Sequence, residues 1–116
     1  MREKLRDKGR LEHILEAIDD TIEITENVSF DDFMSNKVLR FAVVKTVEII
    51  GEASYKLTKE FKENHPEVSW AKIVGLRHVL VHGYYQISEV RLWEIVQKDL
   101  LPLREQIQTL YNNNNF

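Results

Sequence analysis

The chain has 116 residues, of which 43% are hydrophobic and 30% are charged, and it contains no cysteine. This composition is typical of one globular domain, and it excludes disulfides, thiolate metal sites and a membrane span of about 18 apolar residues. The net charge of −3 excludes a protein that coats nucleic acid through its overall field, so any nucleic-acid chemistry has to come from a local site.

The first residues, MREKLRDKGRLEH, are too charged to form the apolar core of a signal peptide. The lack of cysteine is compatible with a reducing compartment. We therefore expect a cytoplasmic protein without a membrane partner.

The chain contains four glycines and two prolines, and its apolar residues recur at helical spacing, which predicts an all-α fold. The first helix is expected at about residues 2–27. Its apolar stripe comprises Leu11, Ile14, Leu15, Ile18 and Ile22. Residues 29–34 are expected to form a connector with one short helical turn, capped by Ser29.

A second long helix is expected at about residues 35–64, ending where Pro66 disfavours helix at the residue before it. Its middle contains Gly51, which costs about 1 kcal/mol relative to alanine in a helix interior. A glycine at such a position predicts the close approach of another backbone. The third helix is expected from near Ser69 to Gly83, a typical helix-ending residue.

The last helix is expected to begin after its cap, Ser88. It carries the tightest heptad in the chain, at Trp93, Val96, Leu100, Leu103, Ile107 and Leu110. Pro102 removes one backbone hydrogen bond, which predicts a kink near residues 98–102, because the apolar stripe continues beyond it. Trp93 is predicted to lie in the core, and Trp70 is predicted to anchor the start of the third helix.

These helices predict an up-and-down antiparallel four-helix bundle with a short extra helical turn. They form one domain over residues 1–111, followed by an asparagine-rich tail at residues 112–116 that is expected to fray. The stripes of the first and last helices repeat about every 3.5 residues, which also favours pairing with another chain.

The third helix carries much polar chemistry in the stretch GLRHVLVHGYYQIS, residues 75–88. Arg77 and Tyr84 would share one face of a continuous helix, and His82 reaches the side of Arg77 only if the helix ends near Gly83. A guanidinium stays charged and presents a fixed fork of donors, which suits a phosphate. An imidazole that titrates near neutrality suits proton transfer.

A structural interpretation of the same residues is also open. In it, Arg77 pairs with a carboxylate such as Glu48 or Glu52. His82 is then a helix-end residue, and the tyrosines pack with their hydroxyls outward.

A metal site is a further interpretation. His78 and His82 are spaced i and i+4, which places both rings on one helical face, as in helical zinc sites. The charge of Arg77 would oppose a bound cation. The third ligand would have to come from Glu48, Glu52 or His65.

The sequence Arg77-x4-His82-Gly83-Tyr84 resembles the R-x4-H-x-Y motif of the HepT-like toxins, a branch of the HEPN superfamily of helical RNases. VEIIGEASYKL, residues 47–57, is similar to the family's helix with an I-G-E-A core. HPEVSWAKIVGLRHVLVHGYY resembles the block that contains the motif, and VRLWEIVQKDLLPLREQI resembles the C-terminal helix, proline included. The position after the arginine, often asparagine in the family, is His78 here, either a second titratable group or a polar replacement.

The resemblance covers roughly residues 5–110 and implies a HEPN-like homodimer in which the motifs of two protomers face one groove. It implies metal-independent cleavage of RNA without a cofactor. It also implies a type VII-like toxin–antitoxin pair, in which a MntA-type nucleotidyltransferase antitoxin adds AMP to the motif tyrosine. That residue is Tyr84 here, with Tyr85 as an adjacent candidate.

Metal-free cleavage uses the 2′-hydroxyl of RNA as an internal nucleophile. We therefore expect His82 to move the proton and Arg77 to stabilise charge on the phosphoryl oxygens. Glu48 or Glu52 would support the site by orienting Arg77 or the histidine. The alternative function is a non-catalytic nucleotide- or substrate-binding partner subunit of a nucleotidyltransferase.

Overall fold

The computed structural model describes residues 2–83, 88–114 and 116, and the side chains of these residues except those at 81–83. Every regular element in this part of the chain is a helix, which confirms the all-α fold. None of these helices is both long enough and apolar enough to cross a membrane. The elements are α1 (Arg2–Thr25), α2 (Phe30–Ser35), α3 (Lys37–Tyr55), α4 (Lys59–Asn64), α5 (Trp70–Gly83), α6 (Glu89–Glu94), the π-helical η2 (Ile95–Asp99) and α7 (Leu100–Asn113).

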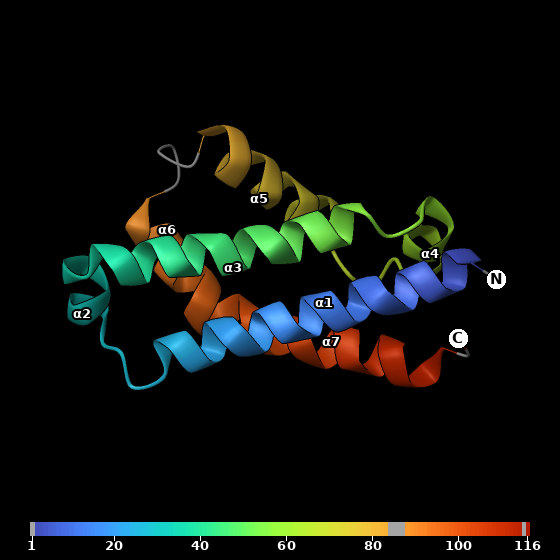
Figure 1. Cartoon of the computed structure of the whole chain (residues 1–116), viewed down its shortest axis with the longest axis horizontal. Helices are drawn as coiled ribbons and strands as arrows, with labels where there is room; N and C mark the ends of the chain where they lie inside the picture. Colours follow the sequence, from blue (N-terminus) through green and yellow to red (C-terminus); the bar gives the residue numbers. More distant parts are fainter. Residues whose placement is uncertain (1, 84–87, 115) are drawn as a thin grey trace.

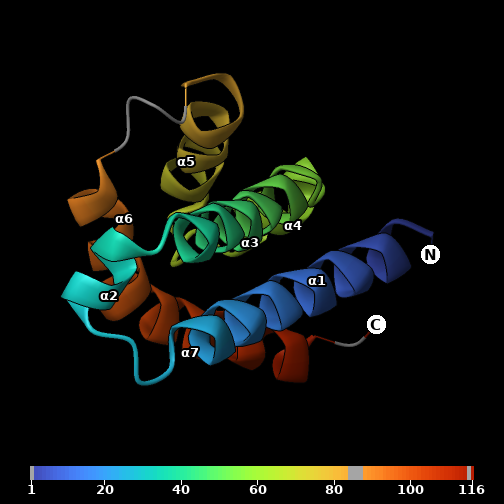
Figure 2. The same ribbon diagram turned by 60° about the vertical axis from the view of Figure 1, so that its left-hand side comes forward.

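The long helical runs α1, α3, α5 and α6–η2–α7 alternate in direction, and both termini lie at the same end of the molecule (Figure 1). This is the predicted up-and-down bundle. α3 lies between α1 and α5, while α7 packs along α1 (Figure 2). The short helix α2 is the predicted extra turn: the Ser29 hydroxyl accepts a hydrogen bond from the backbone N–H of Asp32.

The bundle is open between α5 and the last helical run. A groove of about 620 Å³ lies there, and its walls are largely apolar. Val47 and Ile50 of α3, Leu76 of α5 and Leu103 of α7 are among the residues that line it. α5 is therefore held mainly by its contact with α3.

The predicted stripe of α1 faces the core, where Leu11, Ile14 and Ile18 are completely buried. The same face also buries polar residues that the stripe did not predict. The hydroxyl of Thr21 donates a hydrogen bond to the hydroxyl of Thr46 in α3, with 2.7 Å between the two oxygens. A polar contact thus crosses the apolar interface between α1 and α3.

The prediction of one helix over residues 35–64 is wrong, because α3 ends at Tyr55 and α4 begins at Lys59. Thr58 caps α4, and its hydroxyl accepts a hydrogen bond from the backbone N–H of Phe61. The carboxylate of Asp7 in α1 accepts hydrogen bonds from the Thr58 backbone N–H at 2.9 Å and from its hydroxyl at 2.7 Å. A tertiary contact therefore fixes the break between the two helices.

The disturbance expected near residues 98–102 takes the form of a π-helical turn, η2, rather than a simple kink. Leu100 donates its backbone N–H to the carbonyl of Ile95, five residues earlier. In a regular helix, the Pro102 ring would clash with the carbonyl of Lys98, four residues earlier. Lys98 lies within the wider π-helical turn. The stripe continues beyond it, as predicted, with Leu100, Ile107 and Leu110 buried.

The two tryptophans have the predicted packing roles. Trp93 is partly buried and packs against the core, with its ring centroid 5.0 Å from that of Phe33. Trp70 is buried at the start of α5, and its indole N–H donates to the backbone carbonyl of His65 at 2.9 Å. Helical structure in α7 extends to Asn113, two residues beyond the domain end that we expected.

Candidate functional site

Gly51 is the point at which α5 crosses α3. A β-carbon added to Gly51 would stand 2.3 Å from the β-carbon and 3.0 Å from the α-carbon of Arg77. Non-bonded carbons essentially never approach to 2.3 Å, so a residue with a β-carbon at position 51 would push α5 away from this position. The predicted close approach of another backbone is confirmed, and the residue that approaches is Arg77 itself.

The guanidinium of Arg77 lies on the ring of Tyr55, with 4.9 Å between its central carbon and the ring centroid. Tyr55 follows Gly51 by four residues and therefore shares its face of α3. The pair has the geometry of a cation–π contact. Arg77 Nε is buried and has no hydrogen-bond partner within the described part of the chain.

The two glutamates that we expected near Arg77 pair with nearby lysines, one within α3 and one directly after it. Glu48 lies 3.6 Å from the ammonium of Lys45, and Glu52 lies 3.1 Å from that of Lys56. The hydrogen bond and charge of Lys56 lower the pKa of Glu52, and the charge of Arg77 lowers it further by a smaller amount. Glu52 is therefore within electrostatic reach of Arg77, although no ion pair joins them in the described residues.

His82, the other predicted site residue, belongs to α5, five residues after Arg77, but its side chain lies outside the described residues. Tyr84 and Tyr85 lie outside them as well. His78 lies on the exposed side of α5. The convergence of Arg77 and His82 therefore stays a prediction.

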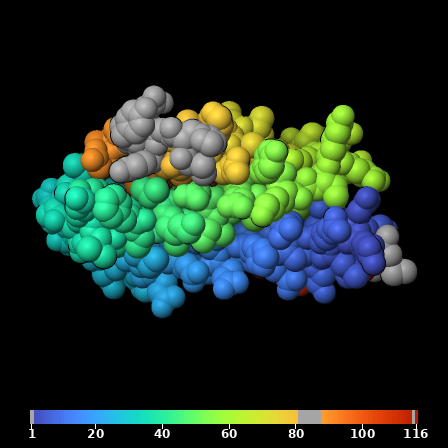
Figure 3. Space-filling model, turned by 45° about the horizontal axis from the view of Figure 1, so that its top comes forward, coloured from blue at the N-terminus to red at the C-terminus, as the bar shows by residue number. Residues whose placement is uncertain are grey.

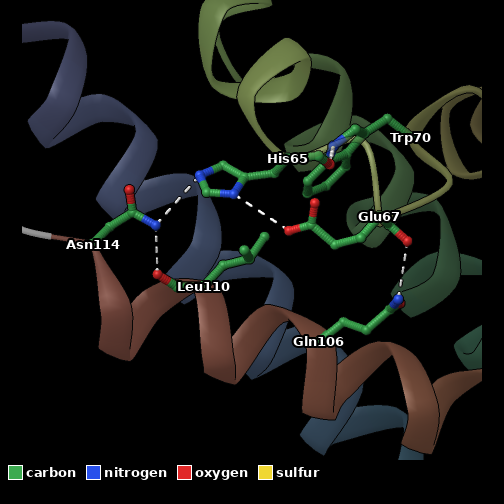
Figure 4. A network of polar contacts seen from close by, with 6 residues as sticks. All are labelled: His65, Glu67, Trp70, Gln106, Leu110 and Asn114. Carbon is green, nitrogen blue, oxygen red and sulfur yellow. Dashed lines mark hydrogen bonds and ion pairs between the residues drawn. The ribbon is translucent and has the colours of Figure 1, made fainter.

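His65, a candidate third metal ligand, lies before the start of α5, whereas Arg77 lies seven residues into that helix, a rise of about 10 Å. Figure 4 shows that both of its ring nitrogens have partners: Nδ1 lies 3.4 Å from the Glu67 carboxylate, and Nε2 lies 3.4 Å from the Asn114 amide. This network joins the connection between α4 and α5 to the end of α7. In the part of the chain that the structure describes, no three His, Asp or Glu side chains form a group that could hold a metal ion.

The family model described as Ribonuclease HepT-like matches residues 14–110, most of the chain. The chain belongs to this family. A relative in Methanocaldococcus jannaschii, whose name marks it as a predicted RNase, is 40% identical over 87% of this chain and 93% of its own. A predicted ribonuclease HepT of Thermococcus cleftensis is 38% identical over 89% of this chain and 94% of its own.

A third relative, a predicted RNase of Caldanaerobacter subterraneus subsp. tengcongensis, is 40% identical over 86% of this chain and 89% of its own. No solved structure gives a significant match. The membership of this HepT-like chain in the HEPN superfamily agrees with the resemblance drawn from its motif and with its all-helical bundle.

Tyr55 is the residue at this site that the sequence analysis did not single out. It lies within the segment around Gly51 that resembles the family, but its spacing from the glycine was not used. Residues four apart share a helical face, so residue 55 lies next to Gly51 on the side of α3 that faces α5. An arginine that packs on Gly51 can therefore reach the side chain of residue 55. That spacing is the signal that could have found it.

Proposed function

We propose that this HepT-like chain is a metal-independent endoribonuclease of the HEPN type and the toxin of a toxin–antitoxin pair. The observation that carries the proposal is the state of Arg77. Its backbone is fixed at Gly51, its guanidinium lies on the ring of Tyr55, and no carboxylate pairs with it in the described residues. A cation in this state can bind a phosphate. The RNase names of its relatives support the same activity.

The proposed reaction is an internal displacement at phosphorus. The ribose 2′-oxygen forms a bond to the phosphorus, and the bond between phosphorus and the 5′-oxygen of the next nucleotide breaks. His82 takes up the proton of the 2′-hydroxyl or supplies one to the leaving 5′-oxygen, and Arg77 stabilises the charge on the non-bridging oxygens. The products are a 2′,3′-cyclic phosphate and a 5′-hydroxyl, and no metal takes part.

The active form in this proposal is a homodimer with the two copies of the motif facing one groove. Pairing would concentrate the positive charge of both motifs, which lets a chain with a net charge of −3 bind RNA locally. The apolar groove beside α5 is a surface that association would cover. Figure 3 shows that α3 is exposed between α5 and α1.

The proposed antitoxin is a nucleotidyltransferase of the MntA type that adds AMP to Tyr84, with Tyr85 as the alternative target. Attached AMP would bring a phosphodiester anion close to Arg77 along the chain. The anion would compete with the RNA phosphate for the guanidinium and would also block access sterically. Modification would therefore neutralise the toxin.

The proposal is tested with two RNA oligonucleotides that differ at one sugar. The purified chain is incubated in EDTA with an all-ribose substrate and with one that carries 2′-deoxyribose at the cleaved position. We expect cleavage of the first only, with cyclic phosphate ends. Cleavage of both, or cleavage that stops in EDTA, would contradict the mechanism. Absence of cleavage by unmodified chain would favour the non-catalytic partner of a nucleotidyltransferase instead.

A further inference from the structure

We infer that Tyr55 is a positioning residue of this site, because its ring holds the guanidinium of Arg77 where it meets the RNA phosphate. The inference rests on the proposed function. It adds a residue on α3 to a motif that lies on and just after α5. Tyr55 itself is not proposed to touch the reacting atoms.

Arg77 is held at two points. The backbone of Arg77 is fixed because α5 packs on α3 at Gly51. There, Cβ of Arg77 occupies the space that a side chain at position 51 would fill. Its far end lies on the ring of Tyr55, 4.9 Å away. An arginine side chain has many rotamers, and fixing only its backbone would leave the guanidinium free to move.

Hydrogen bonds do not supply the second restraint within the described residues. Nε of Arg77 is buried and unpartnered, and the glutamates on the facing helix lie against Lys45 and Lys56. The ring of Tyr55 is therefore the contact that fixes the direction of the guanidinium. Packing, rather than a hydrogen-bond network, orients the cation.

An aromatic ring is better suited to this task than a carboxylate. A carboxylate would neutralise the guanidinium and occupy its N–H donors. The negative face of a ring attracts the cation but leaves its charge and its terminal N–H donors available for a phosphate. Tyr55 is 54% exposed and Arg77 is partly buried, so open solvent from which RNA can approach lies beside the pair.

The ring, and not the hydroxyl, is the part of Tyr55 that carries the role. The Lys62 ammonium donates a hydrogen bond to the backbone carbonyl of Tyr55, which side-chain substitution does not remove. The same ammonium lies 5.9 Å from the ring centroid, farther than the guanidinium of Arg77 at 4.9 Å. Tyr55→Phe keeps the ring, whereas Tyr55→Leu keeps apolar bulk without it. The two variants separate a cation–π restraint from simple packing.

Phe41 provides a matched control on the same helix. It is 49% exposed, and the ammonium of Lys37 lies 5.5 Å from its ring centroid. Phe41→Leu therefore removes a similarly exposed ring and its contact with a cation. It does not touch Arg77.

The kinetic experiment measures kcat and KM for RNA cleavage by the wild type and by these variants, alone and combined with Arg77→Ala. We expect Tyr55→Leu to lower kcat by about 10- to 100-fold, because small misplacements of a catalytic group have effects of this size. Tyr55→Phe and Phe41→Leu should stay within about twofold, a change within the scatter of a surface substitution. Tyr55→Leu should cause no further loss in the Arg77→Ala background, because it acts through Arg77.

Equal activity of Tyr55→Leu and the wild type would overturn the inference while leaving the proposed function intact. A further loss in the Arg77→Ala background would overturn it as well, because Tyr55 would then contact RNA on its own. A wild type that does not cleave RNA would instead refute the proposed function.

A second measurement tests the restraint without cleavage. In a ¹H–¹⁵N NMR spectrum, assigned with Arg77→Lys, the ring of Tyr55 should shift the Arg77 Nε–H signal upfield. Tyr55→Leu should abolish this shift, whereas Tyr55→Phe and Phe41→Leu should keep it. An Nε–H signal that is the same in all four proteins would overturn the inference.

Discussion

Arg77 packs directly on Gly51: its β-carbon lies only 2.3 Å from the position that a β-carbon would take if residue 51 had a side chain. The residue proposed to bind the RNA phosphate is thus also the residue at which α5 contacts α3 most closely. A change in the spacing of these helices would move the guanidinium directly. Stability and activity are therefore coupled at this crossing.

Gly51→Ala should test that coupling. The added methyl group would force α5 away from α3, and overpacking of this kind costs about 1–3 kcal/mol of unfolding free energy. RNA cleavage should fall as well, even at temperatures at which the variant is folded. Thermal unfolding and cleavage rates measure the two effects.

Gly75→Ala is the control for Gly51→Ala. Gly75 also lies in α5, but a β-carbon there would meet nothing within 4 Å. Alanine should therefore raise stability by up to about 1 kcal/mol through helix propensity. Equal effects of the two substitutions would show that the crossing does not depend on the missing side chain.

Asp7→Ala should destabilise the junction between α3 and α4. It would leave the backbone N–H and the hydroxyl of Thr58 without their acceptor, a loss of about 1–3 kcal/mol in unfolding free energy by urea denaturation. Asp20→Ala, at an exposed position of the same helix, should change stability by less than about 0.5 kcal/mol. If both variants unfold at the same urea concentration, the carboxylate does not hold the junction.

Glu52→Gln should have an effect that depends on pH. Because Lys56, and to a smaller extent Arg77, lower the pKa of Glu52 below its ordinary value of 4.5, the folded state favours the carboxylate. The resulting stability is present above pH 4.5 and is lost as the pH falls through the pKa of the folded state. At neutral pH the loss should be at most about 0.5 kcal/mol, because the pair is exposed.

Urea denaturation of Glu52→Gln and the wild type across this pH range measures that difference. The effect of Glu52→Gln should shrink in a Lys56→Gln background, which removes its largest cause. A difference between Glu52→Gln and the wild type that grows toward acid pH would contradict the sign of the shift.

The tyrosine proposed to receive AMP can be identified by a matched pair of variants. Incubation with the proposed nucleotidyltransferase and ATP should add one AMP to the wild type and to Tyr85→Phe but not to Tyr84→Phe, as measured by intact mass. The modified protein should lose RNA cleavage. The reverse pattern would assign the role to Tyr85, and addition to neither variant nor wild type would refute this regulation.

The sequence predicted those parts of the fold that depend on repeated local patterns. Leu11, Ile14 and Ile18 of the first stripe are buried as expected, and so are Val96, Leu100, Ile107 and Leu110 of the heptad. The break after Tyr55 could not be predicted, because it depends on a contact between residues 7 and 58. Periodicity reports which face is apolar, whereas distant hydrogen bonds decide where a helix stops.

At the candidate site, the same distinction holds. Gly51 could be assigned to a close helix crossing, because glycine destabilises the interior of a helix relative to alanine. The close approach of a second helix explains its presence there. The partner of Arg77 could not be assigned in the same way, and the expected glutamates pair with lysines three or four residues away along the chain instead. The ring of Tyr55 holds Arg77 because the two helices cross at that point, a fact of tertiary structure.

The most direct measurement of the central claim is the initial rate of RNA cleavage in EDTA by the wild type and Arg77→Ala. Arg6→Ala, which removes an exposed positive charge from α1, serves as the control. We predict a loss of about 100- to 1,000-fold for Arg77→Ala, the usual cost of removing one electrostatic stabiliser, with wild-type folding and an unchanged rate for Arg6→Ala. Equal rates for Arg77→Ala and the wild type would contradict the account.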